Sequence, residues 1–256
     1  MIPLSVVIIS FNEEKDIGRC LESVKEVADE ILVVDSLSTD STPEVCQSFG
    51  VRFISHTFEG YVNQKNFALK EAKYDHVLSL DADEALSEPL KKVIIDIKNN
   101  WEYDGYIFNR RNRYCGKWMR FTTLYPDRKL RLFDRRKAQW AGYDPHDQVK
   151  MATGSSVMRI HADLLHWAME DLEEQKRKTL NFAEIAARAY ADSGKKPWPG
   201  QGLIHGSWRF FREYFFQLGI LEGKHGIRIA WYSARYAYLK YTLLKKIISH
   251  GDKPSD

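Results

Sequence analysis

Three carboxylates follow directly on a short apolar run: Asp81, Asp83 and Glu84 come after Val77–Leu80. In extended backbone, residues i and i+2 point to the same side, so Asp81 and Asp83 would repel each other unless a cation lay between them. Mg²⁺ and Mn²⁺ prefer oxygen ligands of this kind. An isolated Asp-x-Asp is more often a solvated acidic loop, so the neighbouring segments must decide between a metal site and a surface turn.

Polar side chains also end two earlier apolar runs. Ser10, Asn12 and Glu13 close the first run, and Asp35 closes the second, ahead of the hydroxyl-rich stretch 36–42. Open α/β sheets bind ligands at the carboxyl ends of their strands, so these groups are placed to meet a ribose or base and a metal-bound diphosphate. The Walker pattern and the Gly-x-Gly-x-x-Gly fingerprint are absent, which points away from kinases and dehydrogenases.

The first hundred residues alternate strand-like and helix-like patterns with short connections, which is typical of βαβ units in a parallel sheet. The predicted strands are 4–10, 30–35, 51–55 and 76–80, and the predicted helices are 14–27, 43–49, 62–73 and 89–99. Later segments predict strands at 105–109 and 129–133, separated by a long loop, and helical regions at 169–192 and 207–248. We therefore expect an α/β fold with a mostly parallel, Rossmann-like sheet. The catalytic domain would cover residues 1–193, and a helical, aromatic and basic region would cover 194–256.

Composition sets further limits on the function. The formal net charge of +3 is too small to imply nucleic-acid binding. Three widely spaced cysteines argue against a disulfide framework and a zinc site, and fit a reducing cytosol. The N-terminal apolar run lacks a basic flank and is too short for a signal peptide or a membrane span. We expect a cytoplasmic protein.

The motifs together resemble glycosyltransferase family 2, whose members have the GT-A nucleotide-diphospho-sugar transferase fold. The resemblance is carried by 6–14, 30–42, 64–68 and 80–84. Segments 125–133 and 145–147 further resemble a bacterial branch that adds sugars to the inner core of lipopolysaccharide. Two departures stand out. Ser36-Leu37 replaces the second Asp and the Gly of the family's Asp-Asp-Gly-Ser-Thr-Asp, and His146-Asp147 stands where the branch has His-Glu.

The resemblance implies an inverting hexosyltransferase that moves a sugar from a nucleoside diphosphate, with UDP as first choice, to a glycan or glycolipid. Charge on the departing diphosphate and the weak nucleophilicity of an alcohol limit this reaction, so it needs Mg²⁺ or Mn²⁺ and a carboxylate base. Asp83 is the predicted metal ligand, and by resemblance His166 joins it. Asp147 is the predicted base, with Asp144 and Asp127 as rivals.

The remaining predicted contacts are with the donor and the acceptor. Donor binding is assigned to Ser10, Asn12, Glu13, Asp35, Lys65 and Asp81, with Asp81 touching the ribose or, through water, the metal. Lys65, Arg128 and Arg131 are candidates for the diphosphate or an acceptor phosphate. Plainer alternatives stay open: His166 as a satisfied core histidine, Asp147 in a polar turn, and the basic residues as solvated surface.

The last thirty residues interleave aromatic and basic side chains. Ile227, Trp231, Ala234, Tyr238 and Tyr241 follow helical spacing, with Lys and Arg between them. This pattern predicts peripheral attachment to the cytoplasmic face of the inner membrane, although the rings would equally suit packing on the catalytic domain.

Other functions remain open from the sequence. A polyprenyl-phosphate glycosyltransferase would use the same donor chemistry. A nucleotidyltransferase would usually carry a Gly-rich basic loop after the first strand, which residues 10–14 lack. A non-catalytic nucleotide-sugar-binding module would not need intact Asp81, Asp83 and Asp147. The sugar, the acceptor and the oligomeric state depend on pocket shape and are not predicted.

Overall fold

The computed structural model describes residues 1–143 and 146–250, which divide into two compact units. The first unit consists of residues 1–111 and 127–167, and the second of 112–126 with the chain from 168 onward. Helix α5 (Leu172–Asp192) lies in the second unit because it packs along α7 (Lys224–His250). From the sequence, this helix was expected to belong to the catalytic domain, residues 1–193.

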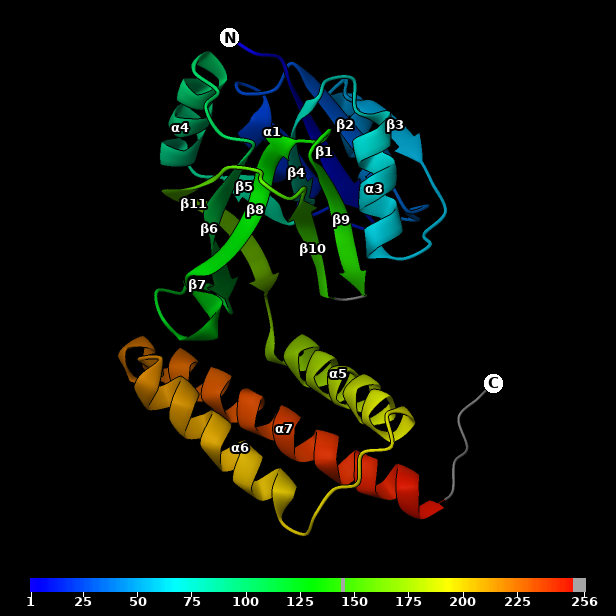
Figure 1. Cartoon of the computed structure of the whole chain (residues 1–256), viewed down its shortest axis with the longest axis vertical. Coiled ribbons are helices and arrows are strands. Elements are labelled where there is room, and N and C mark those ends of the chain that lie inside the picture. Colours follow the sequence, from blue (N-terminus) through cyan, green and yellow to red (C-terminus); the bar gives the residue numbers. More distant parts are fainter. Residues whose placement is uncertain (144–145, 251–256) are drawn as a thin grey trace. The chain divides into compact units, whose positions relative to one another are not determined.

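The first unit is built on a mixed sheet (Figure 1). Among the described residues its strands follow the order β3-β2-β1-β4-β8-β6-β11-β5, with β7 paired to β6. The parallel half consists of β1 (Leu4–Ser10), β2 (Glu30–Asp35), β3 (Arg52–Ser55) and β4 (His76–Asp81). Parallel pairing sets Ser10 level with Asp35, and Ile9 level with Asp81. The polar strand ends therefore meet at one edge of the sheet, as expected.

The other half of the sheet is antiparallel and brings later segments to the same edge. Strand β5 pairs with β11 so that His166 lies level with Glu84. Strands β9 and β10 form a separate two-stranded sheet. The bounds are β5 (Glu84–Leu86), β6 (Gly105–Tyr114), β7 (Lys117–Trp118), β8 (Asp127–Asp134), β9 (Ala138–Tyr143), β10 (His146–Met151) and β11 (Val157–Met169).

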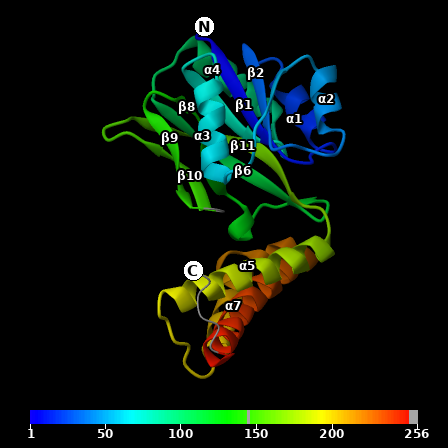
Figure 2. The same cartoon turned by 90° about the vertical axis from the view of Figure 1, so that its right-hand side faces the viewer.

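Both faces of the parallel half are covered. Side chains alternate along a strand, so Val6 of β1 packs in the cluster with α1, α2 and α4, while Val7 packs with α3 and Trp140. Helix α3 and β9 lie side by side (Figures 1 and 2). Burial on both faces explains why these strands are continuously apolar. The helices are α1 (Ile17–Val24), α2 (Thr42–Ser48), α3 (Tyr61–Glu71) and α4 (Glu88–Asn99).

The second unit is helical. Helix α6 (Gln201–Phe211) and α5 both pack on α7. The unit is completed by two short 3-10 helices, η1 (Thr122–Leu124) and η3 (Gly219–Glu222), and by a π-helical turn, η2 (Arg212–Phe216). Helices α6 and α7 approach closely at small residues, since a Cβ on Gly206 would lie 3.1 Å from the carbonyl oxygen of Ala234. Among the described residues, no helix combines the length and the apolar character needed to cross a bilayer.

The predicted α/β class is confirmed, and each predicted strand and helix of the first hundred residues is present. Two later predictions need correction. The Arg- and Tyr-rich stretch after residue 109 was expected to be loop, but β6 continues through it to Tyr114 because it pairs with β8 and β7. The helical region 207–248 is interrupted between α6 and α7, where Leu218 and Gly223 adopt positive φ.

Candidate active site

One buried lysine joins two of the predicted carboxylates. Lys65 of α3 places its Nζ 2.9 Å from Asp81 Oδ1 and 2.7 Å from Asp147 Oδ2. The same Nζ lies 4.3 Å from the centroid of the Trp140 ring. Asp81 ends β4 and Asp147 lies on β10, so Lys65 ties the edge of the large sheet to the β9–β10 hairpin. The lysine that was assigned to the donor thus contacts two carboxylates directly.

A second basic side chain lies behind Asp81. Arg131 Nη2 donates to Asp81 Oδ2 at 2.7 Å and to Glu84 Oε1 at 2.8 Å, and Arg110 Nη1 lies 3.1 Å from Glu84 Oε1. Burial alone would raise the pKa of Asp81, but the charges of Lys65 and Arg131 outweigh it and hold this pKa well below its ordinary value. Asp81 is therefore ionised and fixed in place. Arg131, a candidate phosphate contact, is buried in this ion-pair network.

Asp83 and His166, the two predicted metal ligands, lie together. His166 Nε2 is 3.1 Å from Asp83 Oδ2, because the pairing of β5 with β11 brings the histidine to this edge. The other carboxylate oxygen, Asp83 Oδ1, is buried and has no hydrogen-bond partner within the described residues. A buried carboxylate oxygen without a donor is unusual and suits a cation. Nowhere in the described chain do three or more His, Cys, Asp or Glu side chains form a group arranged for a metal.

Glu13 lies near the negatively charged carboxylates at the same edge of the sheet. Burial, followed by the negative charge of Asp83 and of other nearby carboxylates, raises the pKa of Glu13 to about 7. A carboxyl group that holds its proton close to neutral pH marks a concentration of negative charge. Such a concentration is typical of functional sites, and a bound cation would relieve it.

The predicted donor residues at the ends of β1 and β2 contact one another. Asp35 is buried and accepts hydrogen bonds from Ser10 Oγ at 2.8 Å, Ser38 N at 2.7 Å and Ser38 Oγ at 2.6 Å. The backbone N–H of Asn12 donates to Ser38 Oγ at 2.8 Å. Leu37, which stands where the family pattern has Gly, has a φ of 63°. The chain thus keeps a left-handed conformation at a residue that ordinarily avoids it.

A cavity of about 510 Å³ opens beside Asp81 and Asp147. Arg128 lies exposed at its wall and forms no ion pair with any described residue. Asp127, a rival for the role of base, is held by Arg110 at 2.6 Å and Lys129 at 3.3 Å. The other rival, Asp144, lies outside the described residues. The cavity is lined by Lys65, Asp81, Ile107, Arg110, Arg128, Lys129, Leu130, Arg131, Trp140, Asp147, Gln148 and Val149.

Three residues of this site were absent from the predicted set. Glu84 belongs to the acidic stretch after β4, and Arg110 belongs to a basic cluster, so both had a signal in the sequence. Trp140 had none, because its position over Lys65 depends on the β9–β10 hairpin. These contacts come from the antiparallel strands, whose pairing joins residues far apart in the chain.

Comparisons with known proteins identify the family of this chain. Residues 5–156 match the family model of glycosyl transferase family 2. The chain is 32% identical over 248 residues to the lipopolysaccharide core biosynthesis glycosyltransferase LpsC of Rhizobium meliloti, covering 93% of this chain and 90% of that protein. It is 28% identical over 259 residues to an uncharacterized glycosyltransferase of Rickettsia bellii, covering 95% and 86% of the two chains.

Among solved structures, S. aureus TarS 1-349 in complex with UDP-GlcNAc is similar with a TM-score of 0.48 at 16% identity, over 99% of this chain and 93% of that chain. The family itself is established by the sequence match, which spans every strand of the parallel half of the sheet. This chain belongs to glycosyl transferase family 2 and is a glycosyltransferase of GT-A fold.

Proposed function

We propose that this chain is an inverting transferase that moves a sugar from a nucleoside diphosphate to a lipid-linked glycan during synthesis of the lipopolysaccharide core. One observation carries the proposal: Asp81, at the donor edge of the sheet, and Asp147 line the same cavity and share Lys65. The identity to LpsC over most of both chains supports the lipopolysaccharide core as the destination. The first unit would be the catalytic domain.

Asp83 and His166 fit a Mg²⁺ or Mn²⁺ ion as two of its ligands. The buried Asp83 Oδ1 lacks a partner in the described chain, and His166 is within 3.1 Å of Oδ2. Mg²⁺ is commonly held by one or two protein groups together with substrate phosphates and water, so two side chains are enough when a donor diphosphate supplies the rest. Bound there, the ion would stabilise the charge of the departing diphosphate.

The donor would lie along the carboxyl ends of β1, β2 and β4. Asp35, oriented by Ser10 and Ser38, borders the place for the base or ribose. Asp81 is ionised and held by Lys65 and Arg131, so its carboxylate can accept a ribose hydroxyl without reorienting. UDP is the first nucleotide to test.

Asp147 would act on the acceptor. Its carboxylate accepts a hydrogen bond from Lys65 Nζ at 2.7 Å, which fixes its orientation at the wall of the cavity. In this position Asp147 can take the proton from the acceptor hydroxyl as that oxygen attacks the anomeric carbon. With one base and no nucleophilic carboxylate assigned, a single displacement would invert the anomeric centre. Arg128, exposed beside Asp147, is placed to meet an anionic group on the donor or acceptor.

The second unit would hold the enzyme at the cytoplasmic face of the membrane. Support comes from large apolar side chains that lie exposed on it, including Phe216 at 72%, Ile204 at 59% and Leu221 at 61%. Exposed apolar surface of this extent, next to basic side chains, is typical of interfacial helices.

A screen of nucleotide sugars with a deacylated core oligosaccharide tests the proposal. We expect turnover that requires Mg²⁺ or Mn²⁺, release of a nucleoside diphosphate, and a product of inverted configuration. Release of pyrophosphate would instead identify a nucleotidyltransferase. Donor binding without turnover on any glycan or polyprenyl phosphate would identify a binding module, and transfer to the polyprenyl phosphate alone would change the acceptor.

A further inference from the structure

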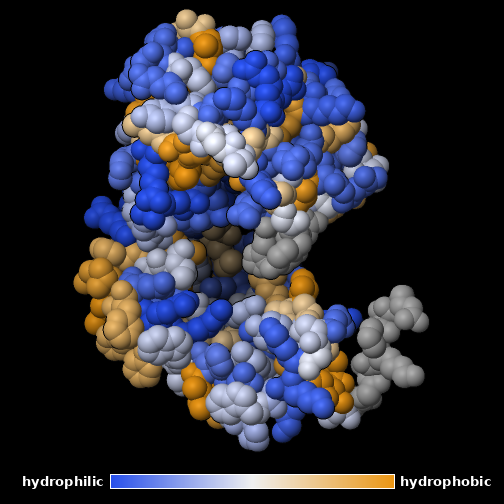
Figure 3. All heavy atoms as spheres, in the orientation of Figure 1, coloured by the Kyte–Doolittle hydropathy of each residue, from blue (hydrophilic) through white to orange (hydrophobic). Residues whose placement is uncertain are grey.

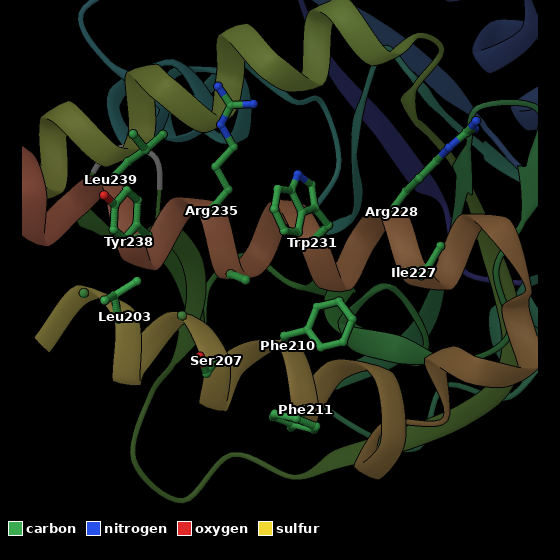
Figure 4. A pocket seen from close by; sticks show the side chains of 13 residues that line it. Leu203, Ser207, Phe210, Phe211, Ile227, Arg228, Trp231, Arg235, Tyr238 and Leu239 are labelled. Carbon is green, nitrogen blue, oxygen red and sulfur yellow. The ribbon is translucent and has the colours of Figure 1, made fainter. Parts of the chain in front are cut away.

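An open groove of about 980 Å³ runs between α6 and α7 (Figure 4). We call it the α6–α7 groove and define it by Gly206, Ser207, Phe210, Trp231, Ala234 and Tyr238. Apart from Ser207 and two arginines, its lining residues are small, aliphatic or aromatic, and Phe210 points from α6 toward α7. The groove lies entirely within the second unit and is separate from the candidate active site.

The groove exists because small residues stand between large rings. Gly206 and Ala234 bring the two helices together, and Ser207 has no bulk to fill the space beside them. Trp231 is 59% exposed, so it forms an open wall rather than a buried contact. The result is a long apolar channel that is open to solvent, a shape that few soluble proteins leave uncovered.

One edge of the groove is cationic. Arg228 and Arg235 line it and extend from α7 on the side away from α6 (Figure 4). Neither guanidinium has a carboxylate within 4.0 Å in the part of the chain that the structure describes. The sequences of α6 and α7 contain basic residues and no Asp or Glu. The edge is therefore complementary to an anion.

The apolar lining continues beyond the groove. Phe211 lines it and is followed by exposed Phe215 and Phe216 in η2 and by exposed Leu221 in η3. Figure 3 shows apolar residues gathered over the segment that joins α6 to α7. A ligand confined to the groove would leave these apolar side chains in water, whereas the hydrocarbon of a bilayer would cover the groove and these side chains together.

We propose that the α6–α7 groove binds an acyl chain of an anionic phospholipid, with the lipid headgroup at the cationic edge, where Arg228 and Arg235 lie about two helical turns apart. The inference rests on the proposed attachment to a membrane and deepens it, because it assigns a defined lipid site rather than general surface attraction. A second copy of the chain fits the groove less well, since apposed α7 helices would bring like charges together without any acid between them.

Quenching of tryptophan fluorescence tests the site in the full chain. Vesicles contain phosphatidylcholine and phosphatidylglycerol in equal amounts, with bromine on the acyl chains of one lipid at a time. We expect brominated phosphatidylglycerol to quench more strongly than brominated phosphatidylcholine, and Trp231→Phe to remove most of that difference. Equal quenching by the two lipids would overturn the proposal.

A variant that fills the groove separates this site from general membrane binding. Ser207→Phe should abolish the preferential quenching by phosphatidylglycerol, while Ile204→Phe, on the same helix but outside the groove, should preserve it. Both variants should still float with the vesicles. If neither the parent protein nor any variant floats, the proposed membrane attachment itself is wrong. If all of them float and the fluorescence of Ser207→Phe is quenched as strongly by brominated phosphatidylglycerol as that of the parent, only the lipid site in the groove is wrong.

The phosphate contact has its own matched control. Arg228→Gln/Arg235→Gln and Lys245→Gln/Lys246→Gln each remove two charges from α7. Loss of two charge-assisted contacts should weaken phosphatidylglycerol binding about tenfold more in the arginine variant than in the lysine variant. Equal weakening contradicts a lipid phosphate at the groove. The proposal is also contradicted if the groove is occupied in place of lipid by a second copy of the chain, seen as a concentration-dependent dimer, or by an acidic amphipathic peptide.

Discussion

Asp83 provides the sharpest single-residue prediction of the proposed mechanism. Asp83→Ala should lower metal-dependent turnover about a thousandfold, because charge stabilisation by a bound metal is worth several kcal/mol. The fold should persist, since Asp83 lies in the turn between β4 and β5, its side chain is 30% exposed, and its loss opens no core cavity. Turnover by the parent and by Asp96→Ala, which removes an exposed carboxylate from α4, is measured beside it. Full activity of Asp83→Ala in chelator would end the metal-ligand assignment.

Asp147 is predicted to affect turnover and not donor binding. Asp147→Asn should cut kcat by about two to four orders of magnitude, because the carboxylate acts on the acceptor proton. The donor Kd, followed by calorimetry, should change little. Asp127→Asn is the comparison, since Asp127 lies on β8 in an ion pair with Arg110. A larger loss in Asp127→Asn than in Asp147→Asn would transfer the role of base.

Glu13 should make stability depend on pH in the absence of metal. Its pKa rises from an ordinary 4.5 to about 7 on folding, so between these values the folded state binds more protons than the unfolded state. Stability contributed by this group is therefore present at low pH and is lost as pH rises through that window. Glu13→Gln should melt at a higher temperature than the parent at pH above about 7 and at a similar temperature below about 4.5. Equal melting temperatures across the whole range in chelator would contradict it.

At the scale of single residues, the sequence identified some of the residues that meet at the site but not how they are paired. Asp81, Asp83 and Asp35 could be placed because each follows an apolar strand, and the edge of a parallel sheet collects such ends. The contact of Lys65 with both Asp81 and Asp147 had no sequence signal, because it depends on the antiparallel hairpin β9–β10.

At the scale of helices and strands, we predict that a side chain at Gly219, in the turn between α6 and α7, destabilises the fold. A Cβ there would lie 2.7 Å from the carbonyl oxygen of Glu213, a backbone atom that cannot move alone. Gly219→Ala should cost about 1–3 kcal/mol of unfolding free energy through overpacking. Gly18→Ala in α1 is the control, because its Cβ would make ordinary van der Waals contacts with Val45 Cγ1 at 3.6 Å and Phe49 Cε2 at 4.0 Å. Equal stability of the two variants in urea unfolding would show that the turn relaxes freely.

The elements that sequence reasoning found are those with local signals. Continuous apolar runs predict β1, β2 and β4, because both faces of these strands are covered. Strand β5 has three residues, and β10 carries the polar stretch around Asp147, for which a polar turn had been left open as an alternative. Their existence depends on partners distant in sequence, which periodicity cannot reveal.

At the scale of the whole molecule, membrane attachment should depend on both charge and apolar surface. The full chain should float with vesicles that contain phosphatidylglycerol at low salt, and added salt should weaken this because exposed charges are screened. Phe216→Ser/Leu221→Ser should lower the floating fraction several-fold, since both side chains are largely exposed. Phe58→Ser, an exposed phenylalanine of the first unit, should not. Flotation that is indifferent to salt and to both changes would exclude this mode of attachment.

The buried pair of Glu84 and Arg131 also limits how this family can diverge. Glu84 has a side chain with no solvent exposure, and Arg131 Nη2 lies 2.8 Å from it. Replacing either residue alone unbalances a buried network, in which Arg131 also pairs with Asp81 and Glu84 also pairs with Arg110. Replacing both with apolar residues of similar volume is often nearly neutral. We expect the two positions to be inherited together among relatives, so that a lineage that loses the acid also loses the arginine. Asp81 would then keep only Lys65 as its partner, and the donor edge of such relatives would have to be rebuilt around that lysine.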